Sequence, residues 1–339
     1  MKNKITSKLA RITRKPFYPT EEDVNNSKLK ELARRLKGKT IEETLTNILE
    51  WTEENIRFWI TRWPFPNVLL IFMATIVATS AIIARIFNSY SLIYLSVIVC
   101  IILLVYLLIC LYIIYKFIFG HESIKSKVRK TLVMIYDTFR VGLPAEKIID
   151  DYRLAVCRDY ARLTATLLFN IYPSSKVYFL DALSHVAAAV KLGDKYYVLD
   201  QRLPILTAER WLTCHNKRKV TVYISELLHD SEGKIHVHFE KYDVLHRQEV
   251  LISVDTKELT KRLAEELKIS QTSQKAKPDF EFPLKNYALY YEDDEIVKYS
   301  LIRAIKNRLR RELCNNIHKV SKIEICQKEK DLSVKVCLN

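Results

Sequence analysis

Three residues between positions 154 and 201 have side chains that can share the work of a nucleophilic reaction. Cys157 opens a run with helical apolar spacing, His185 lies on one arm of a predicted strand pair, and Asp200 ends the other arm. A thiol at a helix amino terminus faces unpaired N–H groups and the positive end of the helix dipole, which favours the thiolate. The three residue types therefore predict a nucleophile, a base and a carboxylate that orients the base.

The strand pair decides whether His185 and Asp200 meet. Residues 182–191 and 195–201 are predicted to form a hairpin whose turn closes at residues 192–193 or one residue later. The first register places Asp200 directly across from His185, and the second places it on the diagonal, two residues along. Both registers keep the two side chains on one face of the sheet, because the period of a strand is two.

The segment resembles the core of the transglutaminase-like superfamily, a papain-related group of cysteine enzymes and some inactive relatives. The resemblance rests on the letters CRDYA that start at Cys157, on SHV around His185 and on YVLD ending at Asp200. Residues 48–58, ILEWTEENIRF, are similar to the helix that opens many of these cores. The resemblance implies an α+β core in which the three residues form a catalytic triad that acts without a cofactor or a metal.

Composition limits the partners of the chain. Its 339 residues carry 54 Lys and Arg against 39 Asp and Glu, and such a surplus favours nucleic acid or an anionic membrane surface. Seven cysteines without a CxxC pair predict neither a disulfide framework nor a zinc cluster, and a reducing compartment fits best. The scarcity of glycine and glutamine, with abundant Lys, Ile and Tyr, indicates a thermophilic prokaryote, and we expect an archaeal one.

Two apolar runs, residues 66–87 and 92–119, predict a transmembrane hairpin. Each run exceeds the roughly 20 residues that a helix needs to cross the hydrocarbon core. Lys and Arg flank the hairpin on both outer sides, which places the amino terminus and the catalytic domain in the cytoplasm. The sequence therefore predicts a two-pass protein of the cell membrane, with the lipid bilayer as a partner.

The hairpin leaves two interpretations of the amphipathic helices predicted over residues 27–63. They are the first part of the core, which makes the hairpin an insertion, or they are juxtamembrane helices. The remaining boundaries are described by composition and pattern. They are a basic tail at 1–26, the transglutaminase-like core at 124–254, a helix and linker at 256–278 and a small α+β module at 279–339.

Within these parts, further elements follow from periodicity. Strands are predicted at 220–225 and 234–241, and the carboxy-terminal module is predicted as a helix ending at 313 followed by a strand hairpin. The basic face of that helix is expected to be solvated or to lie against anionic lipid. The absence of interleaved aromatic residues argues against nucleic acid as its partner.

The function predicted from these features is that of a membrane-tethered cysteine enzyme acting on amide bonds. Its substrate is a protein or peptide near the membrane surface, and its thioester intermediate is resolved by water, as in a peptidase or amidase, or by an amine, as in acyl transfer. The alternative is a non-catalytic domain of the same fold that binds peptides or scaffolds a complex at the membrane. The sequence predicts no oligomeric state.

Overall fold

The structure is a computed structural model, and the chain divides into two compact units: residues 1–57 with 144–339, and residues 58–143. The described residues are 15–59, 142–182, 185–213, 219–220, 222–230, 232–241, 245–246, 279–284, 294–313, 320–328 and 331–338, with scattered positions between 75 and 140 and residues 261 and 265. Apart from residues 261 and 265, the helix and linker predicted at 256–278 lie outside the described residues.

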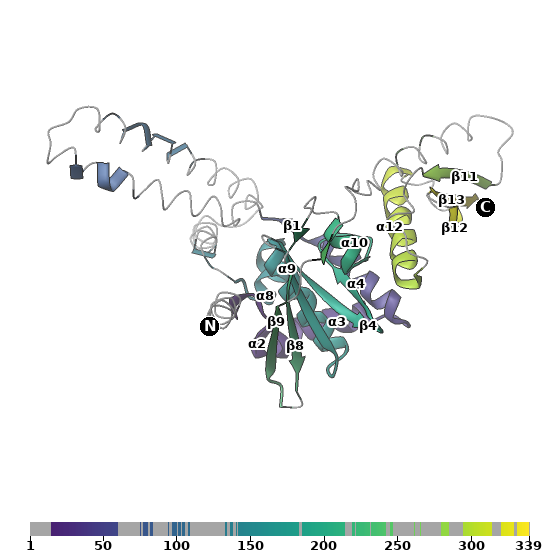
Figure 1. Ribbon diagram of the computed structural model, residues 1–339, viewed down its shortest axis with the longest axis horizontal. Helices are drawn as coiled ribbons and strands as arrows, with labels where there is room; N and C mark the ends of the chain where they lie inside the picture. Colours follow the sequence, from purple (N-terminus) through teal and green to yellow (C-terminus); the bar gives the residue numbers. More distant parts are fainter. Residues whose placement is uncertain are drawn as a thin grey trace, which may run out of the picture. The chain divides into compact units, whose positions relative to one another are not determined.

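A six-stranded antiparallel sheet forms the centre of the first unit (Figure 1). Its strands lie in the order β6-β5-β4-β3-β8-β9, so that neighbours in the sequence are mostly neighbours in the sheet. The bounds are β3 Lys176–Ala182, β4 His185–Leu192, β5 Lys195–Leu199, β6 Leu206–Thr207, β8 Val222–His229 and β9 Ile235–Lys241.

Helix α9, Cys157–Ile171, packs against the sheet at β4. Almost every residue of α9 from Asp159 onward is buried, and Phe169 is among the largest side chains without exposure. The short helix α10, Ala208–Thr213, contributes Trp211 to a second cluster, made with alternate residues of β3, β4 and β5. Successive strand residues point to opposite faces of the sheet. Because both faces of the central strands are covered, the side chains of these strands are mainly apolar.

Two amino-terminal helices belong to the same unit as α9. Helix α3, Ser27–Leu36, starts at Asn26, whose side chain accepts two backbone N–H bonds, and it buries one apolar face against α9. Helix α4, Ile41–Asn55, contacts α9 as well. Helices α3 and α4 lie in the same compact unit as α9, and residues 58–143 form the other unit.

The amino-terminal segment differs from the basic tail expected up to residue 26. A short 3-10 helix, Lys15–Phe17, is followed by α2, Glu21–Asn25, and Tyr18 is buried with its hydroxyl 2.7 Å from Ser225 Oγ. Asp23 is 3% exposed and accepts a hydrogen bond from Arg162 Nε at 2.7 Å. The sequence did not indicate this buried ion pair, because Asp23 follows Glu21 and Glu22, which are charged and exposed.

The carboxy-terminal region contains α12, Glu295–Leu313, and a three-stranded antiparallel sheet in the order β11-β13-β12 (Figure 1). The strands are β11 Asp279–Leu284, β12 Val320–Lys328 and β13 Asp331–Leu338. Helix α12 packs against α4. Its arginines contact carboxylates there: Arg303 Nε lies 3.3 Å from Glu50, and Arg311 Nη2 lies 3.5 Å from Glu54. The basic charge of α12 is thus partly matched by a neighbouring helix.

Two short strand pairs are also present. The π-helix Ile148–Tyr152 follows α8, Ala145–Lys147, and leads into β2, Leu154–Ala155, which pairs with β1, Arg57–Phe58. The short strands β7, Lys219–Val220, and β10, Leu245–His246, pair with each other.

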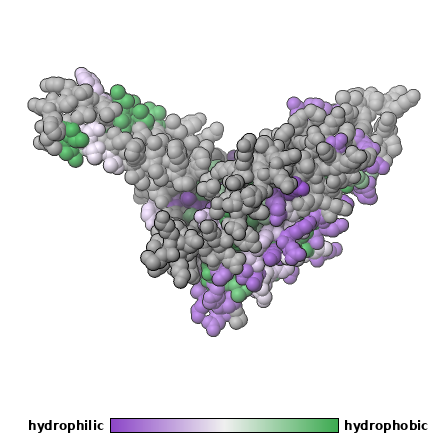
Figure 2. Space-filling view, in the orientation of Figure 1, coloured by the Kyte–Doolittle hydropathy of each residue, from purple (hydrophilic) through white to green (hydrophobic). Residues whose placement is uncertain are grey.

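The predicted two-pass membrane topology, with its cytoplasmic placement of the chain, has to be corrected. Among the residues that the structure describes, no helix is both long enough and apolar enough to cross a bilayer. Most of residues 66–119 lie outside the described residues, and only scattered helical positions are given there. Several of these positions have exposed apolar side chains, such as Ile82 and Ile101. Figure 2 shows hydrophobic patches on the described positions of this second unit. The prediction of membrane spans had rested on the apolar composition of the two runs.

Candidate active site

Cys157 is the first residue of α9, as the sequence predicted. The helix starts there because the Asp159 carboxylate accepts the Val156 N–H at 3.1 Å, and Asp159 is itself buried at 1% exposure. An acidic residue in the first turn also complements the helix dipole. As a first-turn residue, Cys157 has an N–H without an acceptor inside the helix, and its side chain is partly exposed. The thiol and a free donor are therefore available at the same helix end.

The hairpin of β4 and β5 adopts the second of the two predicted registers. Leu192 pairs with Lys195, and the turn is formed by Gly193 and Asp194. Gly193 has φ 59°, a left-handed conformation that favours glycine and suits a two-residue turn. Asp200, which follows β5, is therefore diagonal to His185 rather than directly opposite, and the two side chains share a face as expected.

The diagonal placement brings the two side chains into contact. His185 Nε2 lies 2.9 Å from Asp200 Oδ1 and 2.8 Å from Oδ2. The other ring nitrogen, Nδ1, is left to interact with Cys157. Burial alone lowers the pKa of His185, but hydrogen bonds to Asp200 and to Cys157 outweigh it and raise the pKa from 6.5 to about 10. The imidazole therefore carries a proton near neutral pH, beside the thiol.

Trp211 is a member of the site that sequence reasoning missed. Its indole Nε1–H donates to Asp200 Oδ2 at 2.9 Å, and its ring centroid lies 5.8 Å from that of His185. One side chain thus holds the carboxylate and covers the imidazole. A tryptophan eleven residues beyond the aspartate was visible in the sequence. No periodicity, however, links a short helix to the end of a strand.

The chain that leaves Asp200 is fixed by two distant helices. The Leu203 N–H donates to Glu53 Oε2 of α4 at 3.2 Å, and the Ile205 N–H donates to Ser300 Oγ of α12 at 3.0 Å. Asp294, just before α12, accepts from the Tyr197 hydroxyl of β5 at 2.6 Å. The carboxy-terminal region therefore holds both the strand before Asp200 and the loop after it.

A tyrosine on α9 ties the nucleophile's helix to the end of α4. The Tyr160 hydroxyl donates to the Ile56 carbonyl at 3.0 Å, and Tyr160 is buried. Burial raises the pKa of Tyr160 well above its usual value, so the hydroxyl stays protonated and remains a donor. Tyr160 belongs to the CRDYA letters on which the family resemblance rested, and Ile56 belongs to the upstream letters. The contact explains why both stretches occur together.

No group of three or more His, Cys, Asp or Glu in the described part of the chain is arranged to hold a metal ion. His236 and His238 lie on one face of β9, and His236 pairs with a carboxylate. His236 Nε2 lies 2.5 Å from the Asp230 carboxylate, an exposed contact across the β8–β9 turn.

Comparison with known proteins identifies the family of the chain. A model of the transglutaminase-like domain family matches residues 27–227, and the chain belongs to that family. The UPF0252 protein MJECL39 of Methanocaldococcus jannaschii is 30% identical over an alignment of 339 residues, and the alignment covers 93% of each chain. A UPF0252 protein of Archaeoglobus fulgidus is 40% identical over 84 residues, 23% of this chain and 26% of the relative.

A second, shorter protein of M. jannaschii, MJECS12, is 56% identical over 59 residues, which cover 17% of this chain and 84% of the relative. These relatives are archaeal, which supports the archaeal origin expected from composition. No solved structure matches the chain. The family match includes Cys157, His185 and Asp200 and ends before the carboxy-terminal region that holds the Asp200 loop.

Proposed function

We propose that the protein is a cysteine enzyme that acts on amide bonds of proteins or peptides through Cys157, His185 and Asp200. The observation that carries the proposal is the His185 side chain, which is bonded to Asp200 through Nε2 and interacts with Cys157 at a helix amino terminus. A protonated imidazole beside a thiol favours the thiolate, which is the nucleophilic form. The family to which the chain belongs supports the same chemistry.

The first half-reaction is acylation. The Cys157 thiolate attacks the amide carbonyl carbon, and the C–S bond forms while the carbonyl electrons move to oxygen. The N–H of Cys157 is placed to donate to that oxyanion. As the C–N bond breaks, the His185 imidazolium gives its proton to the leaving amine, and a thioester remains. Asp200 keeps the imidazole oriented throughout.

The second half-reaction regenerates the thiolate. Neutral His185 takes a proton from water or from a second amine, which attacks the thioester carbonyl. The C–S bond breaks and leaves a carboxylic acid or a new amide. Both acceptors use the same three residues, so the water route makes a peptidase or amidase and the amine route makes an acyltransferase.

The proposal is tested first by the reactivity of Cys157. We expect iodoacetamide to label Cys157 rapidly near neutral pH, and to do so slowly in His185→Ala, because the variant lacks the cation that stabilises the thiolate. Mass spectrometry of the Cys157 peptide separates this residue from the other six cysteines. His236→Ala is a matched control, since that exposed imidazole pairs with Asp230 instead. Slow labelling in both wild type and His185→Ala would favour a non-catalytic peptide-binding domain.

The route is tested with glutamine-containing peptides. Incubation with a fluorescent primary amine shows whether water or an amine resolves the thioester. Label enters the peptide if acyl transfer occurs, whereas hydrolysis yields ammonia or a shortened peptide without label. Cys157→Ala should abolish either product while leaving the fold intact. Product formation that persists in Cys157→Ala would contradict the mechanism.

A further inference from the structure

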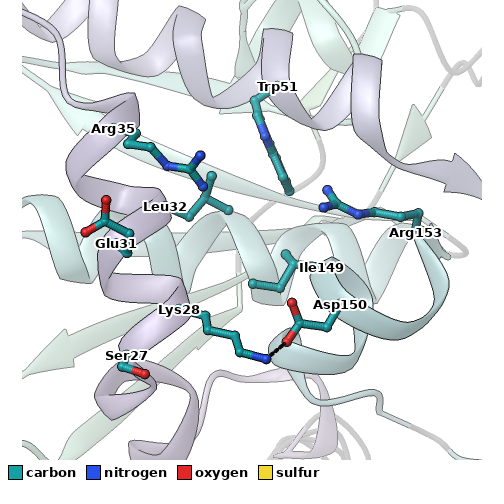
Figure 3. A pocket seen from close by; sticks show the side chains of 9 residues that line it. All are labelled: Ser27, Lys28, Glu31, Leu32, Arg35, Trp51, Ile149, Asp150 and Arg153. Carbon is teal, nitrogen blue, oxygen red and sulfur yellow. Dashed lines mark hydrogen bonds and ion pairs between the residues drawn. The ribbon is translucent and has the colours of Figure 1, made fainter.

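A cavity of about 400 Å³ lies away from the triad, between α3, α4 and the π-helix that precedes β2 (Figure 3). Its apolar wall consists of Leu32 and Ile149, both buried, and of the half-buried indole of Trp51. Arg35 and Arg153 enter it from opposite sides, and Figure 3 shows the indole between their guanidinium groups. The cavity combines a flat aromatic surface with two cations.

The carboxylates at this cavity already have cations of their own. Asp150 accepts from Lys28 Nζ at 2.5 Å, a contact that also raises the pKa of Lys28, and Glu31 pairs with Arg34 at 2.7 Å. Arg35 and Arg153 have no carboxylate partner among the residues that the structure describes. The charge that remains inside the cavity is therefore positive, and an anion would balance it.

The backbone of Arg153 is a second, independent observation. Its φ of 54° and ψ of 28° lie in the left-handed region, where glycine is the favoured residue. The conformation closes the π-helix, since the Arg153 N–H donates to the Ile148 carbonyl at 3.0 Å. A non-glycine residue in this conformation costs free energy, and such residues cluster at ligand-binding and switch sites. Here the guanidinium carbon lies 5.3 Å from the centre of the Trp51 ring.

We propose that this cavity binds a small organic anion with a flat ring. The anionic group lies against the guanidinium group of Arg35, whose planar fork suits a carboxylate or a phosphate, while Arg153 covers the opposite face of the Trp51 indole. The ring lies against the indole face of Trp51 that Arg153 does not cover, above Leu32. A cavity of this volume accommodates a ligand of that size. Aromatic carboxylates and nucleotides share this chemistry, and the experiment separates them.

The probes are indole-3-acetate and adenosine monophosphate, titrated into the full-length chain by isothermal titration calorimetry. Acetate and inorganic phosphate are the ringless controls. We expect one of the two ringed probes to bind, and its ringless counterpart to bind at least about tenfold more weakly because it lacks stacking on Trp51. Arg35→Gln and Trp51→Leu should each weaken binding by about tenfold or more. Lys30→Gln removes a charge from the exposed side of α3 and should leave the affinity unchanged.

Arg153→Gly separates binding from folding. Glycine suits the left-handed backbone, so this variant should melt at or above the temperature of the wild type, while binding weakens because the cavity loses a positive charge and the indole loses the cation on its other face. Binding by neither ringed probe at millimolar concentration would overturn the proposal. So would equal affinity for ringed and ringless anions, or a ringed probe whose affinity is unchanged in Arg35→Gln and Arg153→Gly. Lower thermal stability of Arg153→Gly would show that the side chain serves the fold instead.

Discussion

The pairing of Asp200 with His185 makes a quantitative prediction about the imidazole. The Asp200→Asn variant keeps the size of the side chain and removes its charge. The rise in the pKa of His185 from 6.5 to about 10 corresponds to roughly 5 kcal/mol, shared between Asp200 and Cys157. The side chains of His185 and Asp200 are 22% and 26% exposed, so solvent screens part of their interaction. A share of about 1–2 kcal/mol for Asp200 is left, or about one pKa unit.

The assay is the pH titration of the His185 ring protons, followed by NMR from about pH 6 to 11. Asp200 stabilises the imidazolium, so Asp200→Asn should lower the pKa of His185 by about one unit. Asp194→Asn, in the exposed turn of the same hairpin, should leave the pKa of His185 in place. A folded Asp200→Asn variant in which the pKa of His185 has not moved would refute the assigned role of the carboxylate.

Three further predictions concern stability. Trp211→Phe keeps a ring beside His185 but removes the donor to Asp200, and urea unfolding should show a loss of about 1 kcal/mol. Ser300→Ala leaves the buried Ile205 N–H without its acceptor, which should cost about 1–3 kcal/mol and speed hydrogen exchange of that amide; unchanged exchange would contradict the contact. Because the folded pKa of His185 is raised, its contribution to stability is complete below pH 6.5 and lost as pH rises through about 10. His185→Gln should therefore flatten the urea-unfolding profile over that range.

Local patterns were sufficient for the elements around the triad. The start of α9 at Cys157, the face-sharing of His185 and Asp200 and the buried stripe of α3 all follow from helix caps and from the two periodicities of helices and strands. The register of the β4–β5 hairpin could be narrowed to two choices but not settled. Gly193 can occupy either position of a two-residue turn, and the letters do not say which.

Contacts between segments that are distant in the chain could not be predicted from the sequence. Trp211 contacts Asp200 from another element, and the arginines of α12 pair with carboxylates on α4 about 250 residues earlier in the chain. The sequence of a basic helix face does not show whether the face contacts solvent, an anionic surface or another helix. The two apolar runs misled for a related reason, because hydropathy describes composition and not what surrounds a helix.

The buried pair of Asp23 and Arg162 sets the shortest chain that can carry the site. The family match begins at residue 27, which invites trimming everything before it. Trimming there would leave the Arg162 guanidinium, 7% exposed in the middle of α9, without its counter-charge. Losing one partner of a buried pair typically costs about 3–5 kcal/mol, a large part of a domain's stability. The boundary of the family and the boundary of the foldable protein are therefore at different residues.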